Sequence, residues 1–173
     1  MFIIISIMVL LEFFKPEDLR GLNYSLDEVQ SRFTATAELA LQRIEERGAM
    51  NDFHAFPITV FHQDEVAEFF VLDFGEDKLD LTDNADSALV RSLSINPELQ
   101  GKGIGKSAML KLDDFVRENF KECNELVLAV NEGNALAFDL YLKTGYLYDG
   151  KTRMGRNGRQ YLMHKNYNYS KIC

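Results

Sequence analysis

Cysteine and histidine are scarce in this 173-residue chain, and their scarcity excludes several kinds of site. The chain has two cysteines, Cys123 and Cys173, and three histidines, His54, His62 and His164. Two cysteines 50 positions apart build neither a disulfide framework nor a four-cysteine zinc site. The histidines lack a short metal-ligand spacing such as HExxH. We therefore expect no metal site, and a reducing, cytoplasmic environment.

The chain also lacks a long apolar run. The longest, residues 2–11, is broken by Ser6 and is shorter than the roughly 20 residues that a spanning helix needs. It has neither the basic start nor the small-residue cleavage site of a signal peptide. Its isoleucine, valine and phenylalanine content predicts a buried strand that leads into Lys15 and Pro16. A translation start at Met8 would leave MVLLEFFKP, which is still a sufficient first strand.

Proline-rich linkers, repeats and low-complexity tracts are missing as well, so we expect a single domain over residues 1–173. The composition, 46% hydrophobic and 27% charged, is ordinary for a globular protein. Basic residues are in the minority, 19 against 27 acidic ones, for a net charge of −8. This balance disfavours nucleic-acid and anionic-membrane partners and favours a cationic substrate.

The order of periodic segments predicts an α/β fold with mixed strand directions. Strands are expected at 56–61, 66–74, 88–95, 125–130, 146–148 and 160–164, with a hairpin from the first two and a glycine-rich turn at 155–158. Helices are expected from Pro16, over 103–119 and 134–143, and over 25–47 as one helix with a Ser25–Glu28 capping box, ended by Gly48.

An acid-rich loop covers residues 75–87 and holds five aspartates and glutamates. Two interpretations of this loop stay open at this point. It is either a solvated connection or an acidic rim for a cationic substrate.

Glycines alternate in the segment Gln100-Gly-Lys-Gly-Ile-Gly-Lys106, between a predicted strand and an amphipathic helix. Without a Cβ, glycine lets successive backbone N–H groups converge on an anion at a helix N-terminus. Lys102 and Lys106 lie beside these glycines, so a diphosphate cradle is favoured over a flexible turn.

Spacing separates the phosphate-binding patterns that compete for this segment. A Walker A loop ending at Gly105-Lys106-Ser107 requires glycine at position 100, which is glutamine. A dinucleotide fingerprint over 103–108 fits weakly, because residues 96–102 separate it from the preceding strand. The pattern Q/R-x-x-G-x-G/A fits fully, as Gln100, Gly103 and Gly105.

Together with a downstream segment, this pattern resembles the GNAT acetyltransferase superfamily. The second segment is Asn134-x-x-Ala137-x-x-x-Tyr141-x-x-x-Gly145-Tyr146, similar to the family's N-x-x-A-x-x-x-Y-x-x-x-G-F/Y. The resemblance covers residues 88–148 closely. It implies a mixed, mostly antiparallel central sheet flanked by helices, with acetyl-CoA bound where the parallel strands 88–95 and 125–130 splay apart.

The resemblance also implies which residues bind acetyl-CoA. The strand edge at Leu93, Ser94 and Ile95 would pair with the pantetheine arm like an added strand. The cradle would comprise Gln100, Gly101, Lys102, Gly103, Ile104, Gly105 and Lys106. On the following helix, one stripe would present Asn134, Ala137, Phe138 and Tyr141, while Leu136 and Leu140 would point toward a core.

For catalysis, the resemblance implies that Tyr141 acts as general acid toward the leaving thiolate and that a backbone N–H near Ile95 holds the oxyanion. No carboxylate occupies the stretch Val90-Arg91-Ser92, where many relatives carry a general base. Ser92, Glu28, Glu68 and Asp73 are alternatives, as is an amine that arrives neutral.

The expected activity is direct acetyl transfer from acetyl-CoA to a primary amine, either a small cation or a peptide or protein amine. Cys123 falls just before a strand and away from the expected cleft, which disfavours a covalent enzyme intermediate. The alternative is a CoA-binding sensor module without catalysis. The closing strands would allow a homodimer.

Overall fold

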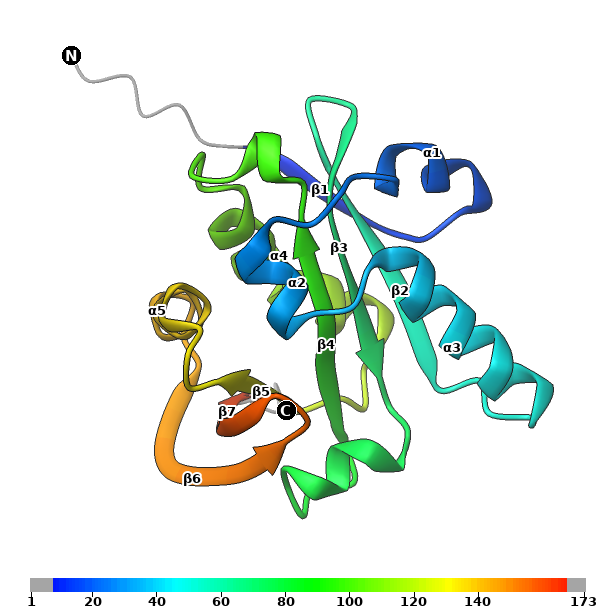
Figure 1. Cartoon of the computed structure of the whole chain (residues 1–173). Helices are drawn as coiled ribbons and strands as arrows, with labels where there is room; N and C mark the ends of the chain where they lie inside the picture. Colours follow the sequence, from blue (N-terminus) through cyan, green and yellow to red (C-terminus); the bar gives the residue numbers. More distant parts are fainter. Residues whose placement is uncertain (1–7, 168–173) are drawn as a thin grey trace, which may run out of the picture.

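One mixed sheet organises residues 8–167, the part of the chain that the computed structural model describes (Figure 1). Its strands are β1 (Val9–Phe13), β2 (Ala55–His62), β3 (Glu65–Asp73), β4 (Ser87–Ile95), β5 (Glu125–Asn131), β6 (Leu147–Gly155) and β7 (Gly158–Asn166). The α-helices are α1 (Leu19–Leu22), α2 (Glu28–Phe33), α3 (Ala37–Ala49), α4 (Ile104–Asn119) and α5 (Ala135–Lys143). Short 3-10 helices cover Pro16–Asp18, Glu76–Asp80 and Pro97–Leu99.

The strand order is β1-β2-β3-β4-β5-β7-β6, and each neighbouring pair is antiparallel except β4 and β5. The predicted fold class is therefore confirmed. The parallel pair is short, because it extends only from Ser87 opposite Glu125 to Leu89 opposite Val127. Beyond this point the two strands separate.

A bulge in β4 accompanies this separation. Against β3, the register changes from Val71 opposite Arg91 to Phe69 opposite Ser94, which leaves one extra residue in β4. Ser92, within the bulge, has a φ of 55°, a left-handed conformation that is uncommon for a residue with a side chain. The bulge thus bends β4 where a cleft opens beside it.

Helices cover both faces of the sheet (Figure 1). On one face, Ile104, Met109 and Leu112 of α4 pack with Tyr141 of α5 against the strands. On the other face, the apolar sides of α1 and α3 pack against Phe69 and Val71 of β3. Phe69, Phe70 and Leu72 alternate between these faces and are fully buried, so β3 is the centre of the core.

The single helix predicted over 25–47 is wrong. The segment forms α2 and α3, separated by an extended Thr34 with φ −131° and ψ 156°. The two N-caps are Asp27, which accepts from the N–H of Gln30, and Thr36, which accepts from that of Leu39. Threonine competes with the helix by bonding nearby backbone, so it favours a restart over continuation. Gly48 lies inside α3 rather than after it.

The other predicted elements are found within a few residues, although β6 and β7 are longer than predicted. The predicted first strand begins among residues 1–7, which lie outside the described residues, as does the question of a Met8 start; β1 is Val9–Phe13. Within residues 8–167, no helix is long and apolar enough to cross a membrane.

The observed caps predict which substitution weakens this region. Thr36→Ala should lower the free energy of unfolding by about 1 kcal/mol, because the N–H of Leu39 loses its acceptor. Ser25→Ala, at the exposed position where the sequence suggests a cap, should change it by less than about 0.5 kcal/mol. Urea unfolding measures both; equal effects would contradict the assignment of the caps.

Candidate functional site

A cleft of about 460 Å³ lies where β4 leaves β5, between these strands, α2 and α5. It brings together many of the residues that the sequence analysis selected: Leu93, Ile95, Gln100, Gly101, Asn134, Ala137 and Tyr141. These lining residues come from segments that are far apart in the chain. They meet where β4 and β5 separate.

At one end of the cleft, the glycine loop leads into α4. Gly103 caps the helix in the left-handed conformation, with φ 78°, which glycine adopts without strain. Gly105 is buried, and a Cβ there would come within 2.8 Å of the Ile95 Cδ1 atom. The first N–H groups of α4 have no acceptor within the helix, and Lys102 and Lys106 are exposed beside them. The loop therefore suits an anion.

Several predicted binding residues lie elsewhere. Ser94 is buried, and its carbonyl and hydroxyl oxygens are each 3.0 Å from the hydroxyl of Tyr24. Ile104 belongs to the core. Phe138 packs against Tyr148 and Tyr161 rather than lining the cleft. These three residues therefore support the walls of the cleft and do not line it.

The prediction that Leu136 points toward a core is wrong. Leu136 is 79% exposed and lines the cleft, and Leu140 lines it too. Tyr141 is 8% exposed and packs against Tyr146, with ring centroids 5.5 Å apart. The helix thus turns its aromatic residues inward and presents leucines to the cleft.

Gln30, which the sequence analysis did not select, occupies the strand edge at Ile95. Its side-chain amide donates to the Ile95 carbonyl oxygen (2.8 Å) and accepts from the Ile95 N–H (2.8 Å). These are the groups that the resemblance assigns to the pantetheine arm and to an oxyanion. A ligand therefore pairs with Ile95 only after Gln30 moves away.

Tyr141 lines the cleft and is buried. Burial raises its pKa, and the neighbouring Glu68 raises it further. The phenol is consequently protonated at neutral pH and can donate a proton. It has no hydrogen-bond partner among residues 8–167, so a ligand in the cleft is free to accept from it.

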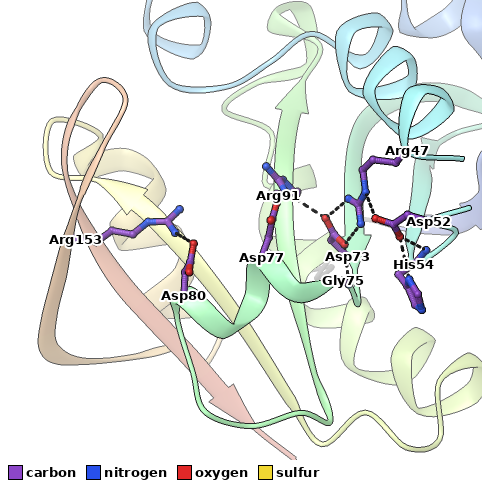
Figure 2. A network of polar contacts seen from close by, with 9 residues as sticks. All are labelled: Arg47, Asp52, His54, Asp73, Gly75, Asp77, Asp80, Arg91 and Arg153. Carbon is purple, nitrogen blue, oxygen red and sulfur yellow. Dashed lines mark hydrogen bonds and ion pairs between the residues drawn. The ribbon is translucent and has the colours of Figure 1, made fainter. Parts of the chain in front are cut away.

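Two of the carboxylates considered as bases are unsuited to the role by their surroundings. Glu28 is exposed on α2 and pairs with Arg32. Asp73 accepts from Arg47, Arg91 and the N–H of Gly75, and these contacts outweigh burial and lower its pKa (Figure 2). A carboxylate stabilised in this way is a poor proton acceptor.

Glu68 is a third case, because its carboxyl group is fully buried and neither oxygen has a hydrogen-bond partner in the described chain. Burial raises its pKa from 4.5 to about 8. Its Oε2 atom is 3.9 Å from the position of a Cβ on Gly105, so it lies beneath the start of α4. A lone acid in the apolar run Val66-Ala-Glu-Phe-Phe is the sequence signal for such a residue.

The acid-rich loop does not form a rim for the cleft. None of its described residues lines the cleft, and residues 79–84 surround another cavity near the start of β5. Asp77 and Asp80 pair with Arg91 (2.7 Å) and Arg153 (3.9 Å) (Figure 2). Lys78 is buried and donates to the carbonyl oxygens of Ala85 and Ser87, which fastens the loop to the sheet.

Comparisons with known proteins agree with this geometry. A model described as the acetyltransferase (GNAT) family matches residues 23–146. The chain is 35% identical over 156 residues to the uncharacterised N-acetyltransferase YbbJ of Bacillus subtilis (strain 168), covering 89% of this chain and 94% of that protein.

Solved structures share the fold at low identity. The aminoglycoside acetyltransferase AAC(6')-Ib, in complex with ribostamycin and coenzyme A, matches with a TM-score of 0.73 and 16% identity, over 91% of this chain and 93% of that one. The ribosomal-protein-S18-alanine N-acetyltransferase from Escherichia coli matches with 0.62 and 17%, over 96% and 99%. A spermidine N-acetyltransferase SpeG chimera from Vibrio cholerae and hSSAT matches with 0.62 and 20%, over 91% and 95%.

The burial of Glu68 predicts a pH-dependent stability. Between pH 4.5 and 8, the folded protein keeps a proton on Glu68 that the unfolded chain releases. The free energy of unfolding should therefore fall as the pH rises, by up to about 1.4 kcal/mol per unit from this group. Glu68→Gln should remove this slope in urea unfolding from pH 5 to 8, whereas Glu65→Gln, exposed on the same strand, should keep it. Parallel profiles for Glu68→Gln and the parent would contradict the assignment.

The position of Gln30 predicts a change in acetyl-CoA affinity. Gln30→Ala should tighten binding by at least about fivefold, because each of the two hydrogen bonds to Ile95 nets about 1 kcal/mol and the ligand no longer displaces the amide. Gln42→Ala, on the exposed face of α3, serves as the control in calorimetric titration. Weaker binding by Gln30→Ala would mean that Gln30 helps to hold the ligand.

Proposed function

Because the chain belongs to the acetyltransferase (GNAT) family, we propose that it transfers the acetyl group of acetyl-CoA directly to a primary amine, with Tyr141 as general acid. The chain is an acetyl-CoA-dependent N-acetyltransferase; the direct route and the role of Tyr141 are the proposal. The observation that supports it is that Tyr141 and Gly101, which belongs to the glycine loop before α4, line the same cleft.

The cleft suits an extended ligand with an anionic end. N–H groups of the segment 101–106 would hold the diphosphate. They lie at the N-terminus of α4, which is the positive end of the helix dipole, and two lysines are nearby. The edge of β4 at Leu93, and at Ile95 once Gln30 has moved, would pair with the amides of the pantetheine arm. Acetyl-CoA then supplies an activated acetyl group as a thioester.

In the transfer, the amine nitrogen attacks the thioester carbonyl carbon and the carbon–sulfur bond breaks. Tyr141 donates its proton to the departing sulfur; burial keeps the phenol protonated at neutral pH, so the proton is present when the carbon–sulfur bond breaks. Asp27 is the one carboxylate among the described residues that line the cleft, and hydrogen bonds from Gln30 and Gln100 lower its pKa. We therefore infer that the amine attacks in its neutral form and then loses its proton to solvent. The rate enhancement then comes mainly from holding the amine and the thioester in the correct relative position.

Removing the hydroxyl group tests the role of Tyr141. Tyr141→Phe should lower kcat by about 100-fold or more and leave the Kd for acetyl-CoA nearly unchanged, because the acid acts in the chemical step. Tyr146→Phe is the matched control, since its buried hydroxyl has no partner in the described chain and lies outside the cleft lining. Release of free CoA thiol measures turnover.

The same experiment separates the enzyme from a CoA-binding sensor. An unchanged kcat in Tyr141→Phe would show that another group protonates the sulfur. Tight acetyl-CoA binding by the parent without acetylation of any amine, from spermidine and aminoglycosides to amino acids and peptides, would favour the sensor.

A further inference from the structure

A second cavity, of about 330 Å³, lies on the other side of β4 from α5. Its walls come from α3, from the end of β3, from the middle of β4, and from the turn between β6 and β7. Four arginines border it: Arg43, Arg47, Arg91 and Arg156. Its volume is at the small end of the range for small-molecule sites, which suits a metabolite rather than a folded protein.

This cavity meets the cleft at the bulge of β4. Arg91 and Ser92 line both spaces. A molecule in the second cavity would therefore lie next to the cleft at Ser92, with acetyl-CoA on the side of α4 and α5. The second cavity is thus placed to hold the body of the acceptor.

The aspartates at this cavity are already neutralised. Asp73 is 1% exposed. Its carboxylate accepts hydrogen bonds from both terminal nitrogens of Arg47 (2.6 and 3.0 Å) and from Arg91 (3.1 Å) (Figure 2). Asp77 pairs with Arg91 at 2.7 Å. A cationic acceptor would have to compete with guanidinium groups for these carboxylates, which makes the cavity a poor site for a polyamine.

Two arginines remain available. Arg43 borders the cavity from α3, and Arg156 borders it from the turn between β6 and β7. Both are exposed, and neither forms an ion pair with any residue in the described range 8–167. The turn is fixed by Asn157, whose side chain donates to the Arg32 carbonyl oxygen at 2.6 Å. The remaining acid, Glu46, is exposed and accepts from Gln42.

We propose that the acceptor is a small amine that also carries a carboxylate, as a free amino acid does, and that Arg43 and Arg156 bind this carboxylate. Guanidinium groups match the planar, bidentate geometry of a carboxylate. Ala40, Ile44 and Val71 give the cavity an apolar part, which suits an aliphatic side chain. The proposal rests on the proposed function, and it replaces the cationic acceptor that the net charge of the chain suggests.

The test compares acceptors that carry different charged groups beside the amine. Leucine is compared with leucinamide, phosphoethanolamine tests phosphate against carboxylate, and spermidine tests a cation. We expect kcat/KM for leucine to exceed that for leucinamide by about 10- to 100-fold. Arg43→Gln and Arg156→Gln should each lose most of this preference, with partial rescue by lysine. Arg20→Gln, exposed on α1, is the control and should keep the preference.

A binding measurement keeps this test independent of transfer. With CoA present, N-acetylleucine should bind more tightly than N-acetylleucinamide by a similar factor, and Arg43→Gln should remove the difference. That preference without turnover would contradict the proposed function and leave the carboxylate site standing. Equal binding of the two products, or a higher kcat/KM per neutral amine for leucinamide or spermidine than for leucine, would overturn the site. A preference for phosphoethanolamine over leucine would overturn the assignment to carboxylate.

Discussion

The functional geometry depends on one constraint, the limit of hydrogen bonding between the parallel strands β4 and β5. Their pairing stops after Leu89 and Val127, and the bulge at Arg91 and Ser92 bends β4 away. Backbone N–H and C=O groups beyond that point need other partners. Unpaired groups cost free energy when they are buried, and an exposed strand edge pairs readily with another strand or ligand. In this protein Gln30 supplies a partner at Ile95, and a ligand arm would supply the next. The edge of β4 is therefore satisfied by a side chain at Ile95 and still open to pairing with a ligand.

Two electrostatic environments lie on either side of this opening. Toward α4 and α5, desolvation dominates: Glu68 and Tyr141 are buried, and the pKa of each is raised, so both are neutral at pH 7. Neutral groups beneath the start of α4 would not repel a diphosphate bound there. Toward α3, paired charges dominate, with Asp73 held between Arg47 and Arg91. The bulge at Ser92 is where these environments meet, and it is there that an amine and a thioester would meet as well.

Much of this arrangement could be predicted from the sequence, because local patterns dictate it. The spacing of Gln100, Gly103 and Gly105 identifies the loop, and the helix stripe from Asn134 to Tyr141 borders the cleft at three of its four positions. The break between α2 and α3 was missed, since Thr34 and Thr36 interrupt a helical periodicity that continues through them. Gln30, Arg43 and Arg156 could not be selected, because their roles depend on tertiary neighbours in distant segments. The net charge could not show, for the same reason, that the acids of the loop at 75–87 are in part paired with arginines.

The most direct measurement is calorimetric titration of acetyl-CoA into the parent, Gly101→Glu and Gly150→Glu. Both glycines have positive φ, 73° and 93°, and a Cβ at either would meet no atom within 4 Å, so the two variants share the same strain and the same added charge. They differ in place, because Gly101 lies in the glycine loop and Gly150 in β6. The account predicts binding by the parent and by Gly150→Glu, and a loss of at least tenfold in affinity for Gly101→Glu. Unchanged binding by Gly101→Glu, or no binding by the parent, would contradict it.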